Sequence, residues 1–198
     1  MKKPTRKYEL LIATAYHQFA LFGYEKTSIE DILKASGISK GLFYHHFANK
    51  KELFVFLYTQ AAEDITKKSL EIFQTEDMDL ILFAKKYMQM QFSLSQKNPY
   101  LFPFLKRAEG EKIKEIQDIM EYVLLHRHTW MLERLDWRYL RKDVTKEQSI
   151  SLITWIAEGF TNELLEKEAF FSKENEATFC AYLDVVKKSL LKEKGELL

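Results

Sequence analysis

The side chains best placed to do chemistry lie in one segment, Thr27 to Phe47, and the chemistry that it predicts is DNA recognition. The segment fits a short helix, a turn that contains Gly37, and a second short helix, which is the size of a DNA-binding helix-turn-helix. The residues of the second helix that we expect to point outward are Lys40, Gly41, Leu42, Tyr44 and His45. The chain shows no nucleophile with a plausible base, no phosphate-binding glycine loop and no metal-ligand spacing, so we expect no enzyme.

Local signals mark the ends of these two helices. Thr27 with Glu30 fits a capping box, in which a hydroxyl accepts from the backbone and a carboxylate reaches back. Gly37 tolerates the positive φ that a helix end often needs, and Ser39 can cap the next helix. Phe43 and Phe47 lie four residues apart, so both can anchor the second helix to a core, and Ile29, Ile32 and Leu33 give the first an apolar face.

The flanking segments complete a small module. Apolar residues recur at helical spacing from Tyr8 to Phe22, and Gly23 ends that run. Asn49 with Glu52 is a further cap pattern, followed by a long helix predicted over residues 49–73. We therefore predict a DNA-binding domain over residues 1–50 and a second helical domain over 51–198, joined by this long helix.

Two strings of residues in this module resemble a known family. The strings Gly-Ile-Ser-Lys-Gly-Leu-Phe-Tyr-His-His-Phe (37–47) and Asn-Lys-Lys-Glu-Leu-Phe (49–54) resemble the TetR family of bacterial transcriptional regulators. The resemblance covers about the first quarter of the chain in detail. It implies an operator-binding homodimer that a small effector releases from DNA.

The resemblance also implies roles for single residues. The helix that opens at Ser39 would enter the major groove, with Lys40, Gly41 and Leu42 at positions that face base edges. Tyr44 matches a tyrosine that contacts phosphate or a thymine methyl group, and the neighbouring His45 completes the outward face. The positions expected to contact the DNA backbone are Thr27 or Ser28, His46 and Lys50. Leu42 departs from the small or polar residue common in the family, and it could pack or read a thymine methyl group.

The charge distribution supports a nucleic-acid-binding end. Residues 1–51 hold nine Lys or Arg against four Asp or Glu, a net charge of +5. The remainder holds 21 basic and 25 acidic residues, a net charge of −4, although the whole chain carries only +1. A basic module on a mildly acidic body suits one end that binds a duplex and one that does not. For the charge alone, the alternative to DNA binding is that the lysines of the N-terminal cluster are merely solvated.

Composition predicts an all-α fold for all 198 residues. Six Gly, three Pro and no alternating apolar pattern favour helices, which we place near 78–96, 99–108, 111–136, 145–169 and 173–193. The single cysteine, Cys180, lies in an apolar helical pattern and reads as an inert buried thiol rather than a redox sensor. No segment reads as an export signal or a membrane span, so we expect a cytoplasmic protein.

The second domain is rich in large apolar side chains. By the family resemblance it would hold a pocket for a small, mostly apolar effector, although core packing is the alternative for each residue. The candidate lining residues are Phe83, Tyr87, Met90, Phe102, Phe104, Trp130 and Trp155. We expect no cofactor and no metal, because neither the pair His45 and His46 nor the pair His126 and His128 converges on one ion.

The last two helices are the candidate dimer surface. One apolar stripe runs through Ile150, Ile153, Ile156, Ala157, Phe160 and Leu164, and another through Phe179, Leu183, Val186, Leu190 and Leu191. Two such helices from each subunit could form a four-helix bundle, unless both stripes are buried within their own chain. An alternative function is a protein of the same fold that responds to a protein partner instead of a small ligand.

Overall fold

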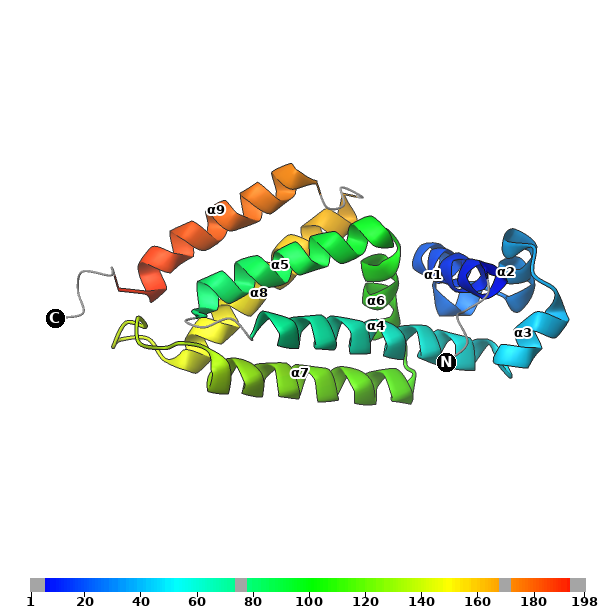
Figure 1. The fold of residues 1–198 in the computed structure, drawn as a ribbon, viewed down its shortest axis with the longest axis horizontal. Helices are drawn as coiled ribbons and strands as arrows, with labels where there is room; N and C mark the ends of the chain where they lie inside the picture. The colour runs from blue at the N-terminus through cyan, green and yellow to red at the C-terminus, as the bar shows by residue number, and fades with distance from the viewer. Residues whose placement is uncertain (1–5, 74–77, 168–171, 193–198) are drawn as a thin grey trace. The chain divides into compact units, whose positions relative to one another are not determined.

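The all-α prediction is confirmed in a computed structural model, which describes residues 6–73, 78–167 and 172–192. Over these residues the chain forms nine helices and no strand, with one isolated bridge between Leu140 and Leu191 (Figure 1). The helices are α1 (Arg6–Lys26), α2 (Ile29–Ser36), α3 (Lys40–His46), α4 (Lys50–Ile72), α5 (Leu80–Lys97), α6 (Leu101–Glu109), α7 (Lys114–Arg134), α8 (Lys146–Glu166) and α9 (Lys173–Leu190).

The chain divides into two compact units. The first combines residues 1–65 with 98–122 and holds α1, α2, α3 and α6. The second combines residues 66–97 with 123–198 and holds α5, α8 and α9. Helices α4 and α7 contribute residues to both units, so the division is not a single cut along the sequence.

An aromatic cluster forms the core of the first unit. Phe19 of α1 and Phe104 of α6 both pack on Phe54 of α4, with ring centroids 4.8 and 5.2 Å from its ring. All three side chains are fully buried. Tyr16 packs edge-on against Phe104 and donates its hydroxyl to the carbonyl of Leu57 at 2.9 Å, so its burial leaves no unsatisfied polar group. This core holds α1, α4 and α6 together.

Helix α5 packs against α9 and α8 in the second unit. Its buried side chains include Phe83, Met88 and Phe92. Polar links add to the apolar contact, because Lys85 pairs with Asp184 of α9 at 2.6 Å and Gln89 donates to Glu176 at 3.0 Å.

Most predicted helix ends lie within two or three residues of the observed ones. Helix α7 starts at Lys114 rather than 111, because the side-chain amide of Gln117 donates to the carbonyls of Glu109 and Glu111 and holds that turn open. Residues 168–169 and 193 of the predicted helices lie outside the described residues. Across the described part of the chain, no helix combines the length and the apolar character needed to cross a membrane.

Candidate nucleic-acid interface

The N-terminus of α2 is capped one residue later than the sequence predicts. Ser28, not Thr27, accepts from the backbone N–H of Asp31 at 3.0 Å, and the Asp31 carboxylate accepts from the backbone N–H of Ser28 at 3.1 Å. The predicted Thr27–Glu30 box is therefore wrong. Thr27 is buried and donates its hydroxyl to the carbonyl of Gly23 at 2.8 Å, so it ties α2 to the end of α1.

The turn between α2 and α3 has the predicted chemistry. Gly37 ends α2 with φ of 66°, the left-handed region that a residue with a Cβ rarely adopts. Ser39 then caps α3 by accepting from the backbone N–H of Leu42 at 3.3 Å. Phe43 is fully buried and Phe47 nearly so, with their rings 5.9 Å apart, so the inner face of α3 is anchored as predicted.

The opposite face of α3 is exposed to solvent. The predicted contact residues on it are Lys40, Gly41, Leu42, Tyr44, His45 and His46, of which only Leu42 is half-buried. The side chain of Tyr44 is 52% exposed and rests edge-on against the buried ring of Phe43. A short helix held by its inner aromatics and presenting donors outward can lie in a DNA groove without losing its own packing.

An ion pair joins the start of α2 to the start of α3. The amine of Lys40 lies 3.0 Å from a carboxylate oxygen of Glu30, and both side chains are well exposed. This hydrogen bond lowers the pKa of Glu30 and raises the pKa of Lys40. Sequence reasoning assigned Glu30 to the helix cap and missed this contact, because ten residues and a turn separate the partners.

Lys50 is less free than the other predicted contacts. Its amine donates to the carbonyl of Tyr24 at 2.8 Å and lies 4.3 Å above the centre of the Tyr24 ring. Both contacts join the first turn of α4 to the end of α1. Two of the three ammonium donors remain for a phosphate, so Lys50 can serve the packing and an anion together.

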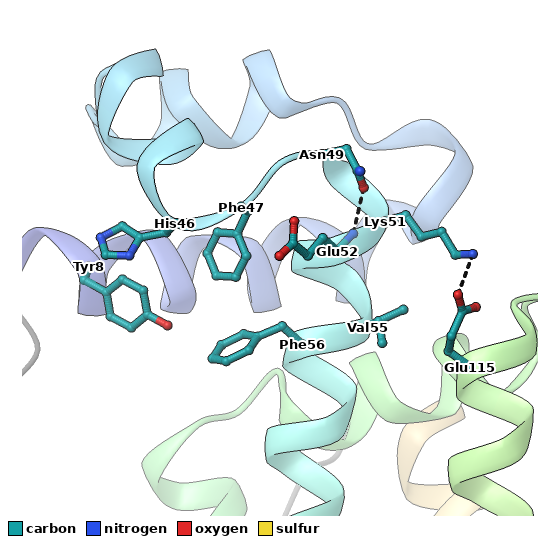
Figure 2. A pocket seen from close by; sticks show the side chains of 9 residues that line it. All are labelled: Tyr8, His46, Phe47, Asn49, Lys51, Glu52, Val55, Phe56 and Glu115. Carbon is teal, nitrogen blue, oxygen red and sulfur yellow. Dashed lines mark hydrogen bonds and ion pairs between the residues drawn. The ribbon is translucent and has the colours of Figure 1, made fainter. Parts of the chain in front are cut away.

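The first turn of α4 borders an open groove of about 600 Å³ within the first unit (Figure 2). Its lining residues are Tyr8, His46, Phe47, Asn49, Lys51, Glu52, Val55, Phe56 and Glu115. Asn49 accepts from the backbone N–H of Glu52 at 2.9 Å, which confirms the predicted cap. Lys51 pairs with Glu115 of α7 at 2.8 Å, and the ring of Tyr8 lies 4.8 Å from that of His46. His46 therefore lies between the outer face of α3 and this groove.

The structure distributes the predicted effector-lining residues over both units. Phe102 and Phe104 belong to the first unit, where Phe104 is part of the core that supports α1. The other candidates, Phe83, Tyr87, Met90, Trp130 and Trp155, belong to the second unit. Among these, Phe83 is buried, Trp155 is 69% exposed, and the other three are half-buried.

Most of the two predicted dimer stripes are covered by their own chain. Buried members are Ile150, Ile153, Phe160, Leu164, Phe179, Leu183 and Leu190, and the ring of Phe160 lies 5.2 Å from that of Phe179. The stripes therefore follow the alternative stated for them, burial within one chain. The same helices leave other apolar side chains exposed: Trp155 on α8, and Tyr182 and Val185 on α9.

In the part of the chain that the structure describes, neither a metal-binding cluster nor a reactive thiol is present. Among the described residues, no three His, Cys, Asp or Glu side chains gather closely enough to hold a metal ion. Burial raises the pKa of the half-buried Cys180 thiol, which keeps it protonated and unreactive.

Comparison with known proteins agrees with this geometry. The family model described as bacterial regulatory proteins, tetR family, matches residues 11–56, the segment from α1 into α4. The uncharacterized HTH-type transcriptional regulator YhgD of Bacillus subtilis is 28% identical over 124 residues, 58% of this chain and 64% of that protein. The probable acrEF/envCD operon repressor of Escherichia coli K12 is 44% identical over 50 residues, 25% of this chain and 23% of that protein. Residues 11–56 therefore carry the DNA-binding module of the TetR family.

A solved structure shares the fold of nearly the whole chain. The fatty acid degradation regulator FadR from Bacillus halodurans superposes with a TM-score of 0.70 at 19% identity, covering 94% of this chain and 95% of that one. At this identity the match concerns the fold alone. The curated relatives named above are matched over less than two thirds of their length, and the higher identity, 44%, extends over only 50 residues.

Proposed function

We propose that this TetR-family regulator is a repressor that binds an inverted-repeat operator as a homodimer. The observation that carries the proposal is the α2–turn–α3 geometry: Phe43 and Phe47 are buried, while the face bearing Lys40, Tyr44 and His45 is exposed. In this proposal Ser39 to Leu42 face base edges, and Ser28, Tyr44, His46 and Lys50 contact the backbone. Thr27 serves the packing of α2 instead of contacting DNA, since it is buried.

The dimer follows from the size of α3. One helix of seven residues offers few contacts, and a two-fold dimer places two such helices on a palindrome. We place the interface on α8 and α9, through the side chains that a single chain leaves exposed, Trp155, Tyr182 and Val185. In the proposed division of labour, residues 1–50 bind DNA, and 51–198 dimerise and bind a small, mostly apolar effector. A regulator of fatty acid degradation has the same fold, and we take fatty acids as the first candidates of that class.

The test is binding of the purified protein to the DNA upstream of its own gene, measured over a series of salt concentrations. We expect one preferred segment, with log K falling against log salt by about 0.9 for each phosphate neutralised. A competition with fatty acids and other apolar small molecules then tests release.

Two results would contradict the proposal. If a genome-wide selection of bound fragments recovers no preferred segment, the protein does not recognise a specific operator. If a protein partner, and no small molecule, releases the regulator from its operator, the small-effector proposal is wrong. The alternative, a regulator that responds to a protein partner, would then be supported.

A further inference from the structure

We propose that Glu30 is an internal counterion that lowers the affinity of the helix-turn-helix for DNA, because its carboxylate holds Lys40 in the DNA-free protein. The inference rests on the proposed function, because it concerns how tightly the same surface binds DNA. Glu30 is the second residue of α2 and Lys40 the first residue of α3, so the pair spans the turn of the motif.

The geometry gives Lys40 an internal counterion. Its amine lies 3.0 Å from the Glu30 carboxylate, and both side chains are about two-thirds exposed. The lowered pKa of Glu30 and the raised pKa of Lys40 agree with a pair that stays charged on both sides near neutral pH. Asp31 beside Glu30 is already engaged by Ser28, so it is not the acid that holds Lys40.

This pairing weakens binding to DNA of arbitrary sequence. Such binding comes almost entirely from lysines and arginines that displace condensed cations from phosphates. A lysine that already has a carboxylate partner causes no net displacement of cations from the phosphates. The phosphates also repel that carboxylate. Lys40 therefore adds little to non-operator binding while Glu30 is ionised.

An operator can offer Lys40 a better partner. In the major groove a guanine presents two acceptors, O6 and N7, and lysine is one of the two side chains that contact them most often. At such a base pair the amine exchanges one acceptor for two, and the exposed Glu30 side chain can turn to solvent. Releasing Lys40 to the base breaks the ion pair, so Glu30 lowers operator affinity by at least as much as it lowers non-operator affinity.

The experiment compares wild type with Glu30→Gln on an operator fragment and on a non-operator duplex of equal length, each over a salt series. Asp143→Asn is the matched control, because Asp143 also pairs with an exposed basic side chain, Arg141 at 2.9 Å, but in the second unit. Both substitutions remove one negative charge. A Lys40→Gln background, with and without Glu30→Gln, tests whether the effect passes through Lys40.

We expect Glu30→Gln to bind non-operator DNA about 3- to 10-fold more tightly, with a salt slope steeper by about 0.9 for each recognition helix engaged. Operator affinity should rise by at least as much, because the wild-type operator complex has to break the ion pair, while Asp143→Asn matches wild type. In the Lys40→Gln background Glu30→Gln should have no effect.

Unchanged non-operator affinity and slope for Glu30→Gln would overturn the inference while leaving operator binding by wild type intact. An effect that persists without Lys40 would also overturn it, because the carboxylate would then act alone. Failure of wild type to prefer any fragment would remove the proposed function, and the inference with it.

Discussion

Tyr44 is a large aromatic side chain that the chain leaves half exposed at the centre of the proposed DNA-binding face. Its ring is supported by Phe43, so the hydroxyl is held outward at little entropic cost. We predict that Tyr44→Phe weakens operator binding about 10-fold or more, because a hydrogen bond to a charged acceptor is worth about 1.5–3 kcal/mol.

The measurement for Tyr44→Phe is an operator titration at fixed salt, with thermal unfolding to show that stability is unchanged. Tyr122→Phe is the matched control, since that tyrosine is similarly exposed on α7. Equal operator affinity for the two variants would mean that the Tyr44 hydroxyl does not contact DNA.

The Ser28–Asp31 capping box makes stability depend on pH on the acid side. Hydrogen bonds from the Ser28 hydroxyl and backbone lower the pKa of Asp31 below its ordinary value of 3.8. Between the two values the unfolded chain binds more protons than the folded chain, so the stabilisation is complete above about pH 5 and is lost as the pH falls through the folded value. We predict that Asp31→Asn lowers the unfolding free energy at pH 7, and that its difference from wild type shrinks below pH 3.8.

Chemical denaturation from pH 7 to pH 3 measures this difference. Ser28→Ala, which should cost about 0.5–2 kcal/mol as the loss of an N-cap, removes the partner. In that background Asp31→Asn should have a smaller effect and a weaker pH dependence. An effect of Asp31→Asn that is the same with and without Ser28 would show that the box does not carry the stabilisation.

At the scale of the elements, the α2–α3 turn depends on one backbone conformation. Gly37 has φ of 66°, and a Cβ added there would meet no atom within 4 Å, so strain rather than a clash decides the outcome. We predict that Gly37→Ala lowers the unfolding free energy by about 1 kcal/mol. Gly41→Ala, with equally open surroundings but a helical backbone, should be neutral or stabilising.

Urea denaturation of the two glycine variants compares them directly. Equal effects would mean that the left-handed turn is not a determinant of stability. A Gly37→Asn variant should recover part of the loss, because asparagine tolerates this region better than alanine does.

Helix positions could be predicted from the sequence, but single contacts within them could not. Apolar spacing, Gly37, Ser39 and Asn49 gave the helix order and the anchoring of Phe43. The α2 cap was misassigned because the chain reads Thr27-Ser28-Ile29-Glu30-Asp31, so a hydroxyl lies three residues before an acid twice. Only the burial of Thr27 against α1 decides between the two registers, and that requires the tertiary structure.

The second unit shows the same limit of prediction from the sequence. Apolar periodicity on α8 and α9 marks the face that the chain itself buries, since Phe160 and Phe179 meet within one unit. The exposed apolar side chains of these helices, Trp155, Tyr182 and Val185, are too few to show a helical period in the sequence. Phe104 likewise sits among aromatics in the sequence, yet it packs in the core that holds α1. Its partners lie more than 40 residues away, beyond what local spacing can reveal.

At the scale of the whole molecule, the proposed response to an effector is a shift between two conformations. An effector that moves the population from 99:1 to 1:99 must bind the released state about 10⁴-fold more tightly, or ~5.5 kcal/mol. Helices α4 and α7 are the elements that contribute to both units. Within the first unit, Lys51 of α4 also pairs with Glu115 of α7. A conformational change carried by either helix would therefore involve the DNA-binding module directly.

Dimerisation is the property on which the proposed operator binding depends. If α8 and α9 form the interface, the exposed apolar side chains Trp155 and Val185, each 69% exposed in one chain, become buried between two. We predict that Val185→Glu shifts the protein to monomers, because a charge would be buried without a partner. Operator binding should then fall steeply, since one α3 makes too few contacts. Leu125→Glu is the matched control, being 63% exposed on α7. Light scattering after gel filtration measures the mass, and a dimeric Val185→Glu variant would place the interface elsewhere.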